Sequence, residues 1–418
     1  MCPHSTGNKL LCTTIVILAF MVAGCSTKEN SITGPSDSTP GTATIYLNNS
    51  QQIIRGFGGQ NMPGWSDVGD LTPDQVQKAF GTGAGQIGMS ILRIRVPYDS
   101  SKFNLEVPTA QLVQSLGVTT IFASPWSPPP SMKSNNNIVG GILNPSSYAD
   151  YANYLKAFTT YMSSHGVTLY AISLQNEPDV SVTYESCYWN STQMLNFAKY
   201  NAPSIGIKII VPESYNGNRT ISDAILNDPV AAANISIIGV HIYGGGGRTS
   251  YPLAASKGKE VWMTEHLVLD TTWGAAQSTA GEIYDCMNAD MNAYVWWYIR
   301  RYYGPIDENG NVTKRGYAMS QFARFIRPGF YKVDATSEPQ QYVYVTAYKN
   351  GAKVVIVVLN YNSSMSQTFT IWNGSATTFT PYVTSTYKNC AQESDIIVSG
   401  SSFTATLDSS SVTTFVSN

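Results

Sequence analysis

Two glutamates stand at the ends of apolar, strand-like runs, where the chain would hold them in fixed positions. Glu177 directly follows the run 170–176, and Glu265 is the next-to-last residue of the run 260–266. Two carboxyl groups on separate strands can flank a glycosidic bond, one protonated to donate to the leaving oxygen and one ionised to attack the anomeric carbon. Mutual repulsion and different surroundings would push their pKa values apart. A lone glutamate at a strand end is usually a solvated side chain or half of a structural salt bridge.

The residues on either side strengthen the case for Glu177. Pro178 bars continuation of the strand ladder and stiffens the turn. Asn176 places an amide beside the carboxylate, suited to a sugar hydroxyl such as the 2-OH.

Eight strand-like runs alternate with helical stretches such as 146–165 and 191–202, which predicts an α/β fold with a parallel sheet buried on both faces. Eight such units over about 250 residues are typical of a (β/α)8 TIM barrel, whose active site lies at the carboxyl ends of its strands. A doubly wound open sheet is the alternative, although no GxGxxG opens a helix after a first strand. The predicted strands are residues 56–60, 90–96, 119–125, 170–176, 207–213, 235–243, 260–266 and 292–298.

After residues 327–329 the pattern changes to short, Thr-rich, alternating runs separated by turns such as Asn350-Gly351. Alternation of this kind predicts strands and argues against a Ser/Thr-rich linker. We therefore predict a barrel over residues 57–327 and an all-β side domain over 328–418, to which an N-terminal strand within 43–56 would contribute. The predicted strands are residues 342–349, 352–361, 366–372, 377–386 and 402–418.

The N-terminus is predicted to be a targeting segment. Lys9 precedes a mostly apolar stretch, residues 13–23, that is too short for an ordinary transmembrane helix. It ends in Val-Ala-Gly-Cys, which resembles a bacterial lipobox and implies cleavage before Cys25 and lipid attachment to its sulfur. Residues 1–25 would then be a signal, 26–42 a flexible tether, and the protein exported and lipid-anchored. An ordinary cleaved signal peptide, with secretion, is the alternative.

Composition narrows the possible partners. Only 12% of residues are charged and the net charge is -2, so nucleic acid is not an expected partner. Aromatic residues make up 11%, and such rings can stack on the apolar faces of sugars. Outside the signal, three cysteines remain, Cys187, Cys286 and Cys390, with neither a disulfide framework nor metal-ligand spacing; a single bridge is possible, but the sequence does not choose the pair. We expect no metal, no cofactor and, by default, a monomer.

Five longer motifs make the chain resemble glycoside hydrolase family 30, and within it the bacterial glucuronoxylanase subfamily. The resemblance runs from about residue 46 to the C-terminus. It implies a retaining barrel enzyme with the side domain packed rigidly on the barrel. The motifs are residues 54–59 (IRGFGG), 90–94 (SILRI), 123–129 (ASPWSPP), 174–178 (LQNEP) and 294–301 (YVWWYIRR).

The resemblance also implies roles for individual side chains. Glu177 would be the acid/base and Glu265 the nucleophile. Trp296 is expected in the core, and Glu213, which ends the fifth strand, could bind substrate without being catalytic. Trp126 and Trp297 would form walls around the sugar. Tyr243, which ends strand six together with His241, would donate a hydrogen bond that keeps the nucleophile ionised. Arg93 would neutralise charge beneath the two carboxyl groups, or would only be part of a buried ion pair.

Substrate choice depends on the stretch after Glu265. The subfamily reads a methylglucuronic acid branch on xylan, and Arg301 and Tyr303 match its uronate-binding positions. Leu267 and Asp270 stand where the resemblance expects Tyr and Ser. We therefore predict an endo-1,4-β-xylanase that acts on xylan or glucuronoxylan and whose activity depends less on the methylglucuronic acid branch than that of the subfamily. The alternatives are a β-xylosidase, β-glucosidase or glucosylceramidase of the same family, or a non-catalytic glycan-binding surface lipoprotein.

Overall fold

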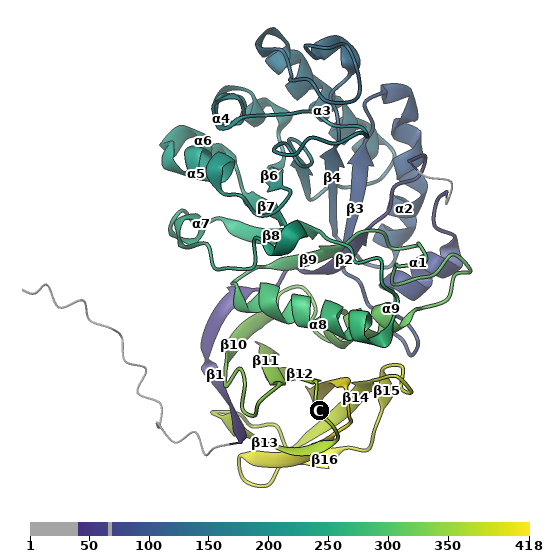
Figure 1. Ribbon diagram of the computed structural model, residues 1–418, viewed down its shortest axis with the longest axis vertical. Coiled ribbons are helices and arrows are strands. Elements are labelled where there is room, and N and C mark those ends of the chain that lie inside the picture. The colour runs from purple at the N-terminus through teal and green to yellow at the C-terminus, as the bar shows by residue number, and fades with distance from the viewer. Residues whose placement is uncertain (1–40, 66–68) are drawn as a thin grey trace, which may run out of the picture. The chain divides into compact units, whose positions relative to one another are not determined.

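Eight parallel strands close into a barrel in the computed structural model, which describes residues 41–65 and 69–418 (Figure 1). Every strand predicted for the barrel is present, and the alternative of an open, doubly wound sheet is wrong because β2 pairs with β9 to close the ring. The proposed signal, Cys25 and nearly all of the tether lie outside the described residues. The strands are β2 Gly56–Gln60, β3 Ile91–Val96, β4 Thr120–Pro125, β5 Ala171–Ser173, β6 Lys208–Ser214, β7 Ile237–His241, β8 Glu260–Glu265 and β9 Ala293–Trp296.

Alternate residues of each barrel strand point inward, and this alternation places the site. Ile91 belongs to a small apolar cluster inside the barrel, whereas Leu92 packs outward against the helices. Since side chains two residues apart share a face of a strand, Arg93 and Arg95 also point inward, toward the carboxyl end of β3. A guanidinium inside an apolar barrel needs acidic partners, and those of Arg93 are Glu213 on β6 and Glu265 on β8, across the barrel.

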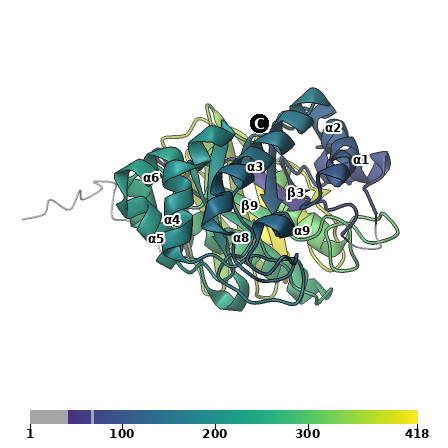
Figure 2. The same cartoon turned by 90° about the horizontal axis from the view of Figure 1, so that it is seen from above.

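Helices cover the outside of the barrel (Figure 2). The predicted helical stretches 146–165 and 191–202 correspond to α3 and α4. The helices are α1 Pro73–Phe80, α2 Val107–Ser115, α3 Tyr148–Ser164, α4 Ser191–Tyr200, α5 Thr220–Asn227, α6 Pro229–Asn234, α7 Pro252–Ser256, α8 Trp273–Asn288 and α9 Lys314–Ala323, with short 3-10 turns at Ser100–Glu106, Pro130–Met132, Pro145–Ser147, Ala202–Ile205 and Tyr243–Gly245. No helix within the described ranges is both long and apolar enough to cross a membrane.

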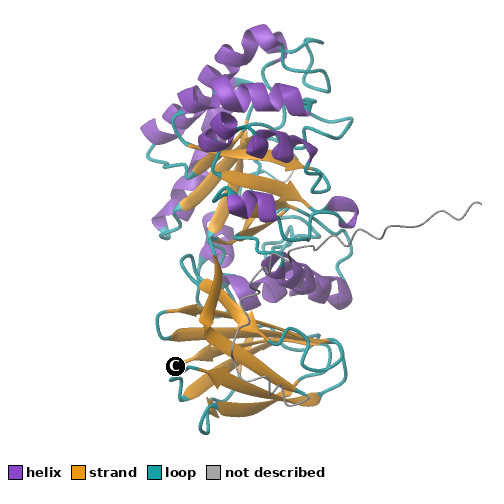
Figure 3. Ribbon diagram, turned by 90° about the vertical axis from the view of Figure 1, so that its left-hand side faces the viewer, coloured by secondary structure: helices purple, strands orange, loops and turns teal. Residues whose placement is uncertain are grey.

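The side domain is a β structure, seen as orange strands at the bottom of Figure 3. Its sheet runs in the order β15-β14-β18-β12-β11-β10-β1-β13-β17, with β16 paired to β14. The N-terminal strand therefore joins the C-terminal strands, antiparallel to β10 and parallel to β13. The strands are β1 Thr42–Ile53, β10 Tyr331–Ala335, β11 Val343–Asn350, β12 Lys353–Asn360, β13 Met365–Trp372, β14 Thr378–Thr384, β15 Ala391–Gln392, β16 Ile396–Ile397, β17 Ser402–Leu407 and β18 Ser411–Ser417.

The predicted run 402–418 is two strands and not one. The chain turns at residues 408–410, where Ser410 has a φ of 42°. β17 then pairs with β13 while β18 lies between β12 and β14. Alternation continues on both sides of the turn, so the periodicity alone did not reveal it.

Buried side-chain amides join the barrel helices to the side domain. Gln277 on α8 donates to the backbone oxygen of Asn360, at 2.8 Å, and Gln321 on α9 donates to Thr384 Oγ1, at 2.7 Å. Both glutamines are almost fully buried. Buried amides must be paired to avoid a desolvation cost, so these bonds specify how the two parts meet.

Candidate active site

The two glutamates meet at the carboxyl ends of the barrel strands. Glu177 lies just past β5 and Glu265 is the last residue of β8, and they are only 4% and 6% exposed. One oxygen of each carboxyl group and a ring nitrogen of His241 all lie within 4.8 Å of one another. Retaining glycosidases hold their carboxyl groups about 5–5.5 Å apart and inverting ones about 6.5–9.5 Å apart. The spacing is that of the retaining class, in which one carboxylate attacks the sugar carbon directly.

Local backbone geometry aims Glu177 into the site. Its φ is 46°, in the left-handed region that non-glycine residues rarely adopt. The carboxyl group is held from two sides: the Tyr184 hydroxyl donates to Oε2 at 3.1 Å, and His241 Nδ1 lies 2.9 Å from Oε1. Strained backbone of this kind persists where the surroundings over-determine it.

Glu265 accepts two strong hydrogen bonds. Arg93 Nη1 donates to Oε2 at 2.5 Å, and the Tyr243 hydroxyl donates to Oε1 at 3.0 Å. Arg93 is fully buried and also donates to Asn176 Oδ1 at 2.7 Å and to Glu213 Oε1 at 3.0 Å. One guanidinium thus links residues that follow or belong to β5, β6 and β8.

Glu213 belongs to the charged network of the site. The sequence left it as a possible substrate contact, but its carboxyl group is fully buried and contacts Arg93 and His241. Burial alone would raise the pKa of Glu213, but the charge of Arg93 and the interaction with His241 outweigh it and lower the pKa to about 2. Glu213 is therefore an anion at neutral pH.

The carboxyl groups of Glu177, Glu213 and Glu265 form one buried cluster with two cations, Arg93 and His241. Burial lowers the pKa of His241, but the charge of Glu265 and the contacts with Glu177 and Glu213 raise it to about 9. Burial raises the pKa of Glu265 above its ordinary value and the nearby Glu177 adds to this, while the charges of His241 and Arg93 offset only part of the rise. With all groups ionised the cluster carries one excess negative charge. Holding one proton on a carboxyl group makes it neutral, which is the state that acid catalysis requires at the start.

An aromatic cavity of about 390 Å³ opens over the carboxyl pair. Trp126 packs against Trp297 with ring centroids 5.5 Å apart and against Trp65 at 5.7 Å. Flat, rigid rings of this kind suit the apolar faces of pyranose sugars. The cavity is lined by Trp65, Trp126, Glu177, Tyr184, Tyr215, Tyr243, Glu265, Leu267 and Trp297.

Sequence reasoning missed Trp65, Tyr184 and Tyr215. Tyr215 stacks on Tyr243, with ring centroids 4.9 Å apart, and Trp65 packs edge-on against Tyr184 at 6.1 Å. Each of the three follows the carboxyl end of a barrel strand, where active-site residues gather. Their position after a strand could have marked these residues as candidates for the site, but many other aromatic residues of this chain also follow a strand.

Several residues predicted to bind substrate are not among those that line the cavity. The described residues that line the cavity include neither Arg301 nor Tyr303; Arg301 Nη1 lies 3.9 Å from Glu308 Oε1, and Tyr303 is 7% exposed. Asn176 turns its oxygen toward Arg93, so its NH2 group is the part that could donate to a sugar. Trp296 is fully buried, as predicted.

Glu177, His241 and Glu265 are also spaced as ligands of a metal ion would be. The chemistry of the set does not fit a metal: His241, with a pKa of about 9, is protonated at neutral pH and offers no lone pair. Arg93 and Tyr243 already occupy the oxygens of Glu265. The arrangement fits proton transfer and nucleophilic attack.

Cys187, Cys286 and Cys390 are buried and free. Burial raises the pKa of the Cys187 thiol to about 12. A disulfide among the cysteines of residues 41–65 and 69–418, left open by the sequence, is not formed.

Comparison with known proteins agrees with this geometry. The family model of glycosyl hydrolase family 59 matches residues 119–316. Glucuronoxylanase XynC of Bacillus subtilis (strain 168) is 41% identical over 426 residues, covering 98% of this chain and 99% of the relative.

Two solved structures cover 90% of this chain and 100% of their own. They are the glycoside hydrolase family 30 subfamily 8 xylanase Xyn30A from Clostridium acetobutylicum (40% identity, TM-score 0.85) and a family 30 endoxylanase from Clostridium papyrosolvens C71 (39% identity, TM-score 0.83). Identity at this level extends over nearly the whole barrel and side domain. The chain belongs to glycoside hydrolase family 30.

Proposed function

We propose that this chain is a retaining endo-1,4-β-xylanase that hydrolyses xylan or glucuronoxylan. The observation that carries the proposal is the pair Glu177 and Glu265, with carboxyl oxygens within 4.8 Å, beneath an aromatic cavity. The xylanases among the similar proteins supply the substrate class.

The first step forms a glycosyl-enzyme. Glu265, ionised and aligned by Arg93 and Tyr243, attacks the anomeric carbon, and the bond from that carbon to the glycosidic oxygen breaks. The proton of Glu177 moves to the departing oxygen, which leaves as the hydroxyl of the remaining chain. Glu177 is then a carboxylate, and its neighbour His241 at 2.9 Å stabilises that charge.

The second step returns the enzyme to its starting state. Glu177 takes a proton from water, whose oxygen attacks the anomeric carbon and breaks the ester bond to Glu265. Two inversions give net retention of configuration. Trp126 and Trp297 hold the sugar, and the NH2 group of Asn176 donates to its 2-OH.

Trapping the intermediate tests both the mechanism and the assignments. A 2-fluoro xyloside with a good leaving group should inactivate the enzyme and leave one adduct, located by peptide mass mapping on Glu265. Glu177→Gln should lower kcat on xylan by about 10²- to 10⁴-fold and still accept the label. Turnover of xylan without an adduct, or an adduct on another residue, contradicts the proposal.

We further propose that cleavage depends only weakly on a uronic acid branch. Leu267 presents an apolar side chain to the cavity where the resemblance expects a hydroxyl. Asp270 is exposed, and its carboxylate accepts from the backbone N–H of Thr272 at 2.8 Å. The carboxylate of Glu308 stands 3.9 Å from Arg301, where it can compete with a uronate.

Product mapping on branched and unbranched xylan tests this second proposal. We expect hydrolysis of linear xylan, and Glu308→Gln should shift cutting toward branched substrate because it removes the competing charge. Products cut only at a fixed distance from each branch, with linear xylan untouched, contradict it.

Export and lipid anchoring at Cys25 are a third proposal, supported by the lipobox-like sequence. Expression in a bacterial host should place the protein in the membrane fraction, and Cys25→Ala should release it. Equal distribution of both forms would overturn the anchor.

A further inference from the structure

A second cavity, of about 500 Å³, lies where α8 meets the side domain and shares no lining residue with the catalytic cavity. Tyrosines from α8, from β11 and from the segment after β12 dominate its wall. The lining residues are Arg248, Ser278, Gly281, Glu282, Tyr284, Asp285, Tyr342, Tyr344, Leu359 and Tyr361.

Three of the four tyrosine rings, those of Tyr284, Tyr344 and Tyr361, are held in place by one another or by backbone oxygens. Tyr344 contacts Tyr284 and Tyr361, with ring centroids 5.5 and 5.9 Å apart. The Tyr284 hydroxyl donates to the backbone oxygen of Ser337 at 3.2 Å, and that of Tyr361 to Gln277 at 3.4 Å. Tyr342 and Tyr361 remain 52% and 39% exposed. Rings ordered in advance lose little conformational entropy when a ligand stacks on them.

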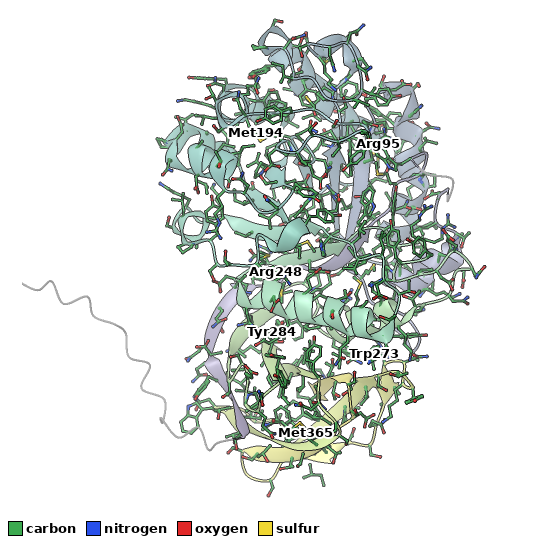
Figure 4. The ribbon with its side chains drawn as sticks, in the orientation of Figure 1. Arg95, Met194, Arg248, Trp273, Tyr284 and Met365 are labelled. Atoms are coloured by element: carbon green, nitrogen blue, oxygen red, sulfur yellow. The ribbon has the colours of Figure 1, made fainter. Side chains whose placement is uncertain are left out.

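The tyrosine wall continues into a polar depression. A neighbouring cavity of about 580 Å³ shares Arg248 and Asp285 and is otherwise lined by small and polar residues such as Thr249, Ser250 and Asn288. Arg248 Nη1 donates to Asp285 Oδ2 at 3.2 Å across the boundary. Figure 4 labels Arg248 and Tyr284 beside α8. The two cavities together form a groove, the α8 groove, with an aromatic end and a hydroxyl-rich end.

We propose that the α8 groove is a second binding site for the xylan chain, separate from the site of cleavage. Sugar rings would stack on Tyr342 and Tyr361, whose exposed faces are apolar with polar rims. The Arg248–Asp285 pair offers donors and acceptors to sugar hydroxyls while its two charges cancel, which suits a neutral polysaccharide better than a polyanion. Binding at two places on one polymer raises the local concentration of substrate at the active site. This inference rests on the proposed xylanase function.

Binding to insoluble xylan tests the α8 groove. The chain carrying Glu265→Gln, which cannot turn over, is compared with the same chain carrying Tyr342→Asn and Tyr361→Ala; Asn suits position 342 because the φ there is 62°. Loss of stacking should weaken binding by about 3- to 10-fold. Tyr387→Ala is the matched control, because Tyr387 is 94% exposed on the side domain and outside the groove. The control should bind as the parent does.

Hydrolysis of soluble xylotetraose separates the two proposals. If the chain with native Glu265 does not cleave xylotetraose or xylan, the proposed function fails. If it cleaves xylotetraose but the tyrosine variant binds insoluble xylan as tightly as its parent, the α8 groove alone is overturned. The same two tyrosine substitutions, made in the chain with native Glu265, should leave xylotetraose hydrolysis unchanged; a loss of that hydrolysis would mark the tyrosines as structural and also overturn the α8 groove.

Discussion

Individual residues of the site are held by a buried network in which each charge has a partner. Arg93 contacts Glu213 and Glu265, and His241 lies between Glu177 and Glu213. Removing one member of a buried network leaves an uncompensated charge, which typically costs about 3–5 kcal/mol. Substitutions that remove a single hydrogen bond therefore test how the carboxyl groups are aligned, and substitutions that remove a charge test the electrostatics of the network.

Tyr243→Phe should lower kcat/KM on xylan by about 10- to 100-fold. The substitution removes the 3.0 Å bond to Glu265 Oε1, and hydrogen bonds to charged groups are worth about 1.5–3 kcal/mol. Steady-state kinetics on soluble xylan measure the change. Tyr215→Phe, beside it in the stack, is the control and should lose less; an unchanged Tyr243→Phe would refute the alignment of Glu265.

His241→Asn should move the acid limb of the pH profile of kcat/KM to higher pH. His241, with a pKa of about 9, is a cation throughout the working range, and its charge lowers the pKa of Glu265. Loss of the cation raises the pKa of that carboxyl group, so a higher pH is needed to ionise it. The exposed His165 is the control, since His165→Asn should leave the profile unchanged. An acid limb that stays or moves downward contradicts the charge assignment.

Secondary-structure elements bring the site together through the carboxyl ends of the barrel strands. The run 170–176 was predicted as one strand, yet β5 covers only Ala171–Ser173. The next residues are fixed by side-chain bonds: Gln175 Nε2 donates to the backbone oxygens of Trp126 and Asn176. Strand-like composition continues past the ladder because those positions are buried, so the sequence pattern could not mark where pairing stops.

Gly58→Ala should destabilise the barrel strongly, by about 3 kcal/mol or more, because a Cβ at this position in β2 would lie 2.0 Å from the backbone oxygen of Ile91. Gly274→Ala is the matched control. A Cβ at Gly274, in the exposed first turn of α8, would have no neighbour closer than 3.9 Å, so Gly274→Ala should raise the free energy of unfolding by roughly 0.5–1 kcal/mol. Denaturant unfolding measures both. Equal stability of the two variants would contradict the close strand approach.

The whole molecule is tied together by the route of its chain. β1 enters the side-domain sheet before the barrel begins, and the chain returns to pair β10 and β13 with it. Below the barrel, α8 and α9 are bonded to the side domain through Gln277 and Gln321. The barrel helices and the side-domain sheet therefore each cover surface that would be exposed to solvent if the other part were missing.

A chain ending after Arg327 should fail to give a soluble, active barrel. It would leave β1 without both partners and expose the faces of α8 and α9 that pack on β12, β14 and β18. An exposed strand edge of this kind promotes aggregation. Soluble yield and xylan hydrolysis are the measurements, with the chain from residue 41 to 418 as control. An active truncated barrel would contradict the shared fold.

The sequence by itself determined the eight barrel strands, the side-domain strands on both sides of the barrel except β10, β15 and β16, and the two glutamates at strand ends. These features follow from local periodicity and short motifs, which can be recognised without knowing which distant segments are in contact. Only the tertiary structure decided that Glu213 lies under Arg93, that Trp65, Tyr184 and Tyr215 wall the cavity, and that residues 402–418 form two strands. Each of those depends on which distant segments meet, and burial and charge at a meeting point arise from all of its neighbours together.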